Sequence, residues 1–351
     1  MKKHYLIIAL AFATTFTACK KDESDANKNN YTDVLNKVSD DVILATYSDL
    51  SLKAALLKQA TTTLETAPTT ANLDAAKTAW VNARKPWEQS EGFLFGPVDQ
   101  AGIDPALDSW PVNIVDLENV LNSGNAITPA FLQAQDGTLK GFHTIEFLLW
   151  GSSSNKQVTD FTAREFEYLA AAATVLASDA KTLYDMWQPA SGNFIAQVQH
   201  AGHGSNIYIS QKAAIEEMTS ALVIIADEVG NGKINEPFSQ SDLSLEESRF
   251  SANSKTDFAD NMRSIQNIYT GTYGAMPAGN GIGAIIQSKN NALHQQVLTH
   301  INNAITSIEA IPGTFSDAVI NNRPAIENAQ KAVRDLQKLL EEQVTPLISN
   351  L

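Results

Sequence analysis

A long apolar stripe with helical spacing is the feature that most limits the folds open to this chain. Apolar side chains recur in alternating steps of three and four residues at Phe166, Leu169, Ala173, Leu176, Ala180, Leu183 and Trp187. A stripe this narrow and this long is typical of a helix that buries one seam in an antiparallel bundle. No segment of the chain alternates convincingly in the manner of a β-strand. The sequence therefore predicts an all-α fold.

The same spacing, together with helix-breaking residues, divides the chain into two sets of helices. The first set is expected at 31–65, 71–92, 112–121, around His143 and around 166–187, and a glycine-rich hinge follows at 189–204. The second set is expected at 206–229, 257–269, 283–310 and 322–344, with a long irregular connection over 230–255. We therefore expect two packed four-helix-bundle domains, 31–195 and 196–351, a division that would fit an ancient duplication.

The first thirty residues read as an export signal and a tether. Residues 1–18 combine a basic start with an apolar middle and end in small residues directly before Cys19. This ending resembles a bacterial lipobox, which predicts lipidation of Cys19, although a plain secretory signal followed by an incidental cysteine is the alternative. Residues 19–30 are polar and suit a flexible tether. We therefore expect an outer-membrane lipoprotein that faces either the periplasm or the cell surface.

Composition narrows the possible partners. The chain has 25 basic and 39 acidic residues and a net charge of −14, so its surface repels nucleic acid backbones and favours cations. Its single cysteine, Cys19, excludes a disulfide framework and a thiol nucleophile in the folded body. We expect a monomer that contacts the membrane only through the N-terminal lipid and has no nucleic-acid partner.

One mostly apolar segment, 141–151, carries an imidazole and a carboxylate three residues apart. His143 and Glu146 share a face of the predicted helix, because positions i and i+3 are neighbours on a helix surface. A polar pair in such a segment costs free energy unless each member finds a partner. The two side chains therefore either satisfy each other and nearby groups or bind a ligand.

Further polar residues lie in aromatic or turn-rich surroundings. Those that we consider as site residues are Arg84, Glu88, Glu91, Asp108, Arg249, Ser251 and Asp257. Arg84 and Glu88 would also fit a solvated ion pair, and Asp108 a helix cap. A His-x-x-Glu unit supplies only two ligands, so a metal would need others, for which Glu91 and Asp108 are the best placed. One nitrogen and three carboxylates suit iron, manganese or calcium better than a thiolate-binding metal, with zinc as a further candidate.

These residues carry a resemblance to a known family. The segments concerned are Gly141-Phe-His143-Thr-Ile-Glu146, Trp80…Arg84…Glu91-Gly-Phe-Leu-Phe-Gly, Asp108-Ser-Trp-Pro and Arg249-Phe-Ser251…Asp257-Phe…Asn261…Tyr269-Thr-Gly271. They resemble imelysin-like proteins, the insulin-cleaving membrane protease family with a Gly-x-His-x-x-Glu signature. The resemblance implies two four-helix bundles with the signature facing a cleft between them. It also implies a metal site at positions that match Glu91, Asp108, His143 and Glu146, as in related modules of bacterial iron-uptake proteins.

Three functions stay open on these grounds. The one we favour is a non-enzymatic binder of iron or another hard cation, or of its complex, linked to iron uptake and to envelope iron-transport components. A metallopeptidase is the second, although the chain lacks a second helical histidine and a clear nucleophile. The third is a surface receptor for an oligosaccharide or a peptide, in which Trp110 and other tryptophans would stack on the ligand.

Overall fold

Helices form nearly all of the regular structure in the computed structural model, which describes residues 30–277 and 279–351. The expected signal peptide, Cys19 and the tether up to residue 29 lie outside the described residues. No β-strand occurs within the described ranges, so the prediction of an all-α fold is confirmed. Among the same residues, no helix has both the length and the apolar character needed to cross a membrane.

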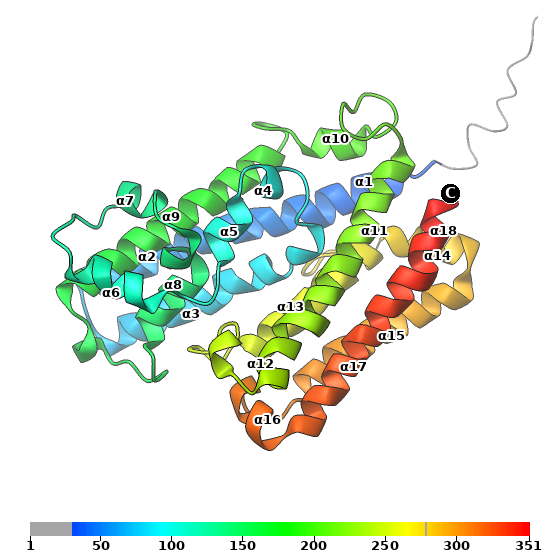
Figure 1. The fold of residues 1–351 in the computed structure, drawn as a ribbon. Helices are drawn as coiled ribbons and strands as arrows, with labels where there is room; N and C mark the ends of the chain where they lie inside the picture. The colour runs from blue at the N-terminus through cyan, green and yellow to red at the C-terminus, as the bar shows by residue number, and fades with distance from the viewer. Residues whose placement is uncertain (1–29, 278) are drawn as a thin grey trace, which may run out of the picture. The chain divides into compact units, whose positions relative to one another are not determined.

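The first half builds one set of four helices around the two longest ones. Its elements are α1 (Thr32–Val38), η1 (Ser39–Leu44), α2 (Ala45–Thr66), α3 (Thr70–Glu88), η2 (Glu91–Phe93), α4 (Pro97–Gln100), α5 (Ile103–Asp108), α6 (Ile114–Asn122), α7 (Pro129–Gln133), η3 (Gly137–Leu139), α8 (Gly141–Trp150), η4 (Val158–Asp160), α9 (Ala163–Trp187) and α10 (Ile195–Gln199). Helix α2 packs on α3 and α9, and α8 packs on the same two helices (Figure 1).

The second half builds a second set of four. Its elements are α11 (Gln211–Asp227), η5 (Glu228–Lys233), α12 (Asn235–Gln240), η6 (Leu243–Leu245), α13 (Ser254–Thr270), α14 (Ile282–Lys289), α15 (Asn291–Glu309), α16 (Phe315–Asn321), α17 (Arg323–Leu339), η7 (Leu340–Val344) and α18 (Thr345–Ser349). Helix α11 packs on α13 and α17, and α15 packs on the same pair (Figure 1). The predicted architecture of two four-helix sets is therefore confirmed.

Local chemistry explains where the long helices of the first set begin. The Thr162 hydroxyl accepts from the Glu165 backbone N–H, and the Glu165 carboxylate accepts from the Thr162 backbone N–H, so a capping box starts α9. The Thr69 hydroxyl caps α3 in the same way by accepting from the Asn72 backbone. Along α9 the apolar stripe from Leu169 to Trp187 is buried in the core, as its spacing predicts.

Three stretches differ from the sequence-based expectation. The connection over 230–255 is partly helical, because η5 and α12 continue almost directly from α11. The helix expected over 71–92 ends at Glu88, and the chain resumes as the separate turn η2. The helix expected over 283–310 is two helices, since Asn290 interrupts it and its side chain caps α15 by accepting from Leu293.

The two halves meet along α3, η2 and α13. Helix α3 contacts α13, while η2 contacts both α11 and α13. The approach at η2 is close, because a Cβ added to Gly92 would lie 2.7 Å from Ser264 Oγ. Residues 31–351 form one compact unit. The division into domains 31–195 and 196–351 stays a prediction.

Candidate functional site

A buried group of polar side chains lies where the two helix sets meet, and we call it the polar cluster. Its members are Arg84 and Glu88 of α3, Glu91 of η2, Asp108 of α5, His143 and Glu146 of α8, Lys233 of η5, Glu247, and Asp257 and Asn261 of α13. None of these residues is more than 6% exposed. Seven different segments therefore deliver charged or polar groups to one nearly dry volume, in which each group needs a partner.

Arg84 is the centre of the polar cluster. Its Nη1 bonds Asp108 Oδ1, and its Nη2 bonds Glu247 Oε1 at 2.7 Å and also pairs with Glu88. Its Nε lies 3.4 Å from Asp257 Oδ2. The planar guanidinium with its fork of donors is suited to such a role, because it presents hydrogens to several carboxylates at once. Arg84 thereby ties α3 to α5, to α13 and to the segment that carries Glu247.

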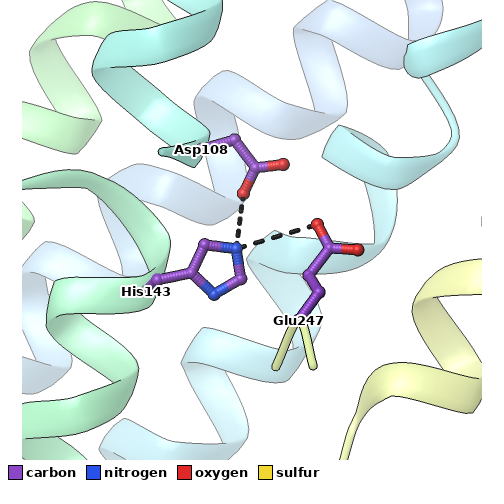
Figure 2. Close-up of side chains that lie close together, drawn as sticks. All are labelled: Asp108, His143 and Glu247. Atoms are coloured by element: carbon purple, nitrogen blue, oxygen red, sulfur yellow. Dashed lines mark ion pairs between the residues drawn. The ribbon is translucent and has the colours of Figure 1, made fainter. Parts of the chain in front are cut away.

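His143 uses its two ring nitrogens on different carboxylates. Its Nε2 lies 3.0 Å from Asp108 Oδ1 and 3.7 Å from Glu247 Oε1 (Figure 2). Its Nδ1 lies 3.3 Å from Glu146 Oε2, while Glu146 Oε1 accepts from the backbone N–H and the hydroxyl of Ser251, each at 2.7 Å. Glu146 therefore holds the ring from behind, in the way that carboxylates orient metal-binding histidines. The Nε2 atom is buried, and its contacts with Asp108 and Glu247 are charge contacts without the alignment of a hydrogen bond.

Lys233 and Asn261 join the remaining carboxylates. Lys233 Nζ lies 2.8 Å from Glu91 Oε2, 3.1 Å from Glu247 Oε1 and 3.7 Å from Glu88 Oε2. The Asn261 amide nitrogen donates to Glu88 Oε2 at 2.6 Å and to Glu91 Oε2 at 2.9 Å. The second helix set thus supplies both the cation and the amide that hold Glu88 and Glu91 in place.

Negative groups outnumber permanent cations in the polar cluster. Burial raises the pKa values of Glu88 and Glu91 well above their ordinary range, although Arg84 opposes the effect at Glu88. Burial also raises the pKa of Asp257 to about 7 against the attraction of Arg84. These carboxyl groups therefore favour a proton or another cation over the free anionic form.

The two carboxyl groups beside the imidazole have lowered pKa values, in contrast to Glu88, Glu91 and Asp257. Burial alone would raise the pKa of Asp108, but Arg84 and then His143 outweigh it and hold that pKa well below its ordinary value. Lys233 and His143 likewise outweigh burial and lower the pKa of Glu247 to about 2. Burial and Arg84 lower the pKa of His143, yet its three carboxylate contacts raise it well above the ordinary value. The imidazole therefore lies against two carboxylates that stay ionised.

Two sets of three side chains place their ligand atoms close enough to share one ion. Asp108, His143 and Glu247 form the first set, and Glu88, Glu91 and Asp108 form the second, with the atoms of each set within 4.8 Å of one another. Asp108 belongs to both sets. Nitrogen and oxygen donors of this kind suit first-row metals and hard cations.

A small cavity adjoins the imidazole on the side of Glu146. It has a volume of about 20 Å³ and is lined by Trp110, Pro111, Val112, His143, Glu146, Ser244, Glu246, Ser248, Arg249 and Phe250. This volume holds about one water molecule. The cavity therefore gives a small ligand access to the edge of the polar cluster, while a folded or extended polypeptide has no room there.

The structure brings most of the sequence-predicted site residues together. Arg84, Glu88, Glu91, Asp108, His143, Glu146 and Asp257 are members of the polar cluster, and Ser251 touches it through Glu146. The ring of Trp110 lies 6.1 Å from that of His143. Arg249 lies at the cavity wall and stacks on Phe250, with no ion pair among the described residues.

The geometry also separates residues that the sequence grouped. Glu91 and His143 belong to different sets of ligand atoms, which only Asp108 links. Sequence reasoning did not select Lys233, Glu247 or Asn261 as site residues, although Asn261 lies in a segment that carries the family resemblance. Glu247 stands in a dense polar stretch, which is a weak signal, and Asn261 lies four residues after Asp257 on the same helix face. Lys233 follows Gly232 in a segment that carried no signal for a buried cation.

Two four-helix sets that share a buried His–carboxylate cluster define an all-α protein with one central polar site. Comparison with known proteins agrees with the all-α fold. The family model described as Imelysin matches residues 43–343, and the chain belongs to this family.

Its relatives include proteins named for iron. The chain is 32% identical over 340 residues to "Iron-regulated protein A" of Synechococcus elongatus, covering 96% of this chain and 91% of that protein. It is 27% identical to the crystal structure of a putative iron-regulated protein A precursor from Parabacteroides distasonis, with a TM-score of 0.82 and coverage of 91% and 94%. An imelysin-like protein from Psychrobacter arcticum, 16% identical over 90% of this chain and 94% of the other, shares the fold with a TM-score of 0.72.

Proposed function

We propose that this protein binds iron, or another hard cation, as cargo in the polar cluster. The observation that carries the proposal is the imbalance of buried charge. Six carboxyl groups, those of Glu88, Glu91, Asp108, Glu146, Glu247 and Asp257, are almost fully buried beside only two permanently cationic side chains, Arg84 and Lys233. Negative charge in excess of the buried cations is costly, so a metal cation that enters this volume gains strong attraction.

The donor atoms fit such a cargo. His143 Nε2 and Glu247 Oε2 are buried and have no hydrogen-bond partner among the described residues. With Asp108 they offer one nitrogen and carboxylate oxygens, a set that suits iron and manganese and also accepts zinc or calcium. In this proposal Asp108, His143 and Glu247 hold the ion, and Glu146 orients the imidazole. The names of the relatives from Synechococcus elongatus and Parabacteroides distasonis support iron as the first cation to test.

The depth of the site bears on the choice between binding and peptide cleavage. His143 is only 2% exposed, and the adjoining cavity holds about one water molecule. A metallopeptidase must bring a polypeptide within bonding distance of its metal. The same depth disfavours a receptor for an oligosaccharide at this place. Binding without catalysis is therefore the function that the geometry supports best.

Calorimetric titration with Fe²⁺, Mn²⁺, Zn²⁺ and Ca²⁺ tests the proposal. We expect one ion per chain in the wild-type protein and no measurable binding after His143→Gln, which removes the nitrogen donor. Glu146→Gln is expected to weaken binding by about 10- to 100-fold, because it loosens the ring without removing a ligand. His200→Gln, at an exposed histidine, is the matched control and should bind as the wild type does. Equal heats for the wild type and His143→Gln would refute the proposal.

We further propose that a lipid on Cys19 anchors the protein in the outer membrane, where it exchanges iron with envelope transport components. The small residues before Cys19 support this anchor. Fractionation of cells that produce the wild type and Cys19→Ser tests it. The wild type should stay with the membrane and carry the mass of a lipid, while the variant should leave the membrane fraction. A wild-type protein without added lipid mass would contradict the anchor.

A further inference from the structure

The ammonium group of Lys233 is surrounded by carboxylates in the way that a bound cation would be. Its Nζ is fully buried and lies within 4 Å of Glu91, Glu247, Glu88 and Glu228. It also lies 5.4 Å from the centre of the Trp110 ring. A buried lysine normally loses its proton through desolvation, but these carboxylates outweigh burial and hold its pKa well above the ordinary value.

A π-helical turn of the backbone directs the Lys233 side chain into the protein interior. Lys233 ends the π-helical turn η5, and the next residue, Ile234, donates its N–H to Val229, five residues back. Such single π-turns occur often at functional sites, because they rotate a side chain out of the regular helical phase. At this turn the lysine points between the two helix sets instead of into water.

One oxygen atom next to these carboxylates has no hydrogen-bond partner. It is Asn261 Oδ1, which is buried and unpaired among the described residues, while the amide nitrogen of the same side chain donates to Glu88 and Glu91. The carboxylates of Glu88, Glu91 and Asp108 also converge to within 4.8 Å here. The four carboxylates within 4 Å of Lys233 Nζ therefore offer more acceptor oxygens than the three hydrogens of one lysine can satisfy.

We propose that Lys233 fills a second cation position, formed by Glu88, Glu91 and Asp108, and thereby limits the polar cluster to one metal ion. This inference rests on the proposed cation binding at Asp108, His143 and Glu247. Asp108 borders both positions, so an ion beside His143 and the ammonium group beside Glu91 share the charge of the cluster. Lys233 determines how many ions the protein carries and does not itself ligate the ion.

Manganese stoichiometry tests this role. Lys233→Met keeps the length of the side chain and removes its charge, and we expect the variant to bind two Mn²⁺ where the wild type binds one. Two ions that share Asp108 should also couple magnetically, which broadens the Mn²⁺ electron paramagnetic resonance signal. Lys53→Met is the matched control, because Lys53 pairs with Asp49 at the surface and far from Asp108 in sequence. Its stoichiometry should equal that of the wild type.

Each result separates this inference from the proposed function. One ion in the wild type and two in Lys233→Met supports both. Equal, non-zero stoichiometry in the two proteins overturns the role of Lys233 and leaves the first site standing. No ion in the wild type and one in the variant refutes the proposed function but supports the role of Lys233. No ion in either protein overturns both.

The variant could fail to fold, because it leaves buried carboxylates without a cation. Refolding with and without Mn²⁺, followed by circular dichroism, then gives the answer. If Mn²⁺ replaces the ammonium group, Lys233→Met should recover its helical signal only when Mn²⁺ is present. A variant that stays unfolded at saturating Mn²⁺ would overturn the proposal. The double variant Lys233→Met/Glu91→Gln, which lacks one carboxylate as well, should fold and return to one ion per chain.

Discussion

Arg84 shows, at the scale of a single residue, how the polar cluster is held together. The side chain is fully buried, yet it contacts the carboxylates of Asp108, Glu247, Glu88 and Asp257. Those contacts come from both helix sets. Arg84 therefore stabilises the fold mainly by pairing with these carboxylates. A buried charge without a partner costs free energy, and Arg84 prevents that.

Replacing Arg84 should therefore destabilise the protein strongly. We expect Arg84→Met to lower the free energy of unfolding by about 3–5 kcal/mol, since it leaves buried carboxylates without their cation. Urea denaturation monitored by circular dichroism measures the loss. Lys331→Met removes one member of an exposed pair with Asp335 and should change stability by no more than about 0.5 kcal/mol. A loss for Arg84→Met as small as that of the control would contradict this account.

Asp257 should make stability depend on pH. Its pKa is raised from 3.8 to about 7 in the folded protein, so the folded state binds the proton more tightly than the unfolded state does. Its contribution is then fully present below about pH 4 and is lost as the pH rises through 7. Over this window the metal-free wild type should lose up to about 1.4 kcal/mol per pH unit relative to Asp257→Asn. Thermal unfolding of both proteins from pH 4 to 8 should show the flatter profile for the variant, and parallel profiles would contradict it.

The start of α8 shows how two elements are set against each other. Gly141 has φ of +77°, and a Cβ added there would lie 2.3 Å from the backbone oxygen of Leu107 at the end of α5. The glycine therefore lets the first turn of α8 touch the last turn of α5. Asp108 follows Leu107 directly, and His143 comes two residues after Gly141. This close approach is what places the carboxylate beside the imidazole.

Gly141→Ala should disturb both stability and the site. Positive φ and a clash with backbone together are expected to cost about 2–4 kcal/mol, because neither helix end can move without breaking its packing. The separation of α5 and α8 should also weaken Mn²⁺ binding. Gly124→Ala is the control, since an added Cβ there meets no atom within 4 Å. Denaturation and calorimetric titration check the two effects, and wild-type values in both would contradict the role of this glycine.

Individual helices could be predicted from the sequence more easily than the contacts between them. The helical spacing of α9 and the Gly-x-His-x-x-Glu segment of α8 are local patterns, and each predicts its own helix without knowledge of the rest of the chain. The contact of Lys233 with Glu91 is different, because it depends on a π-turn and on packing between segments far apart in the sequence. No local pattern marks such a lysine as buried. For the same reason, the pairing of His143 with Glu247 lay beyond prediction.

At the scale of the whole molecule, the polar cluster joins the two helix sets. Arg84, Glu88 and Glu91 of the first half contact Lys233, Glu247 and Asn261 of the second. Helix α3 also packs on α13, and the turn η2 packs on α11 and α13. Unfolding one half would therefore expose buried charges of the other, which strongly favours a common transition.

Calorimetry of residues 31–351 should accordingly show one unfolding transition, with the calorimetric and van't Hoff enthalpies equal. Mn²⁺ at about 100 times its dissociation constant should raise the unfolding free energy by about 2.7 kcal/mol, since it binds only the folded state. The metal-induced shift should vanish in His143→Gln. Two resolved transitions in the wild type would show instead that residues 31–195 and 196–351 unfold as separate domains.

The depth of His143 also determines how quickly cargo is exchanged. An ion beside a side chain that is 2% exposed reaches solvent through a cavity with room for about one water molecule, so its exchange should be faster when Trp110 or the segment over 244–250, which line that cavity, moves away. Openings of this kind take microseconds to seconds. Residence time then depends on the protein's fluctuations as well as on the metal–ligand bonds. A partner that loosens the cover could hasten delivery without competing for a single ligand.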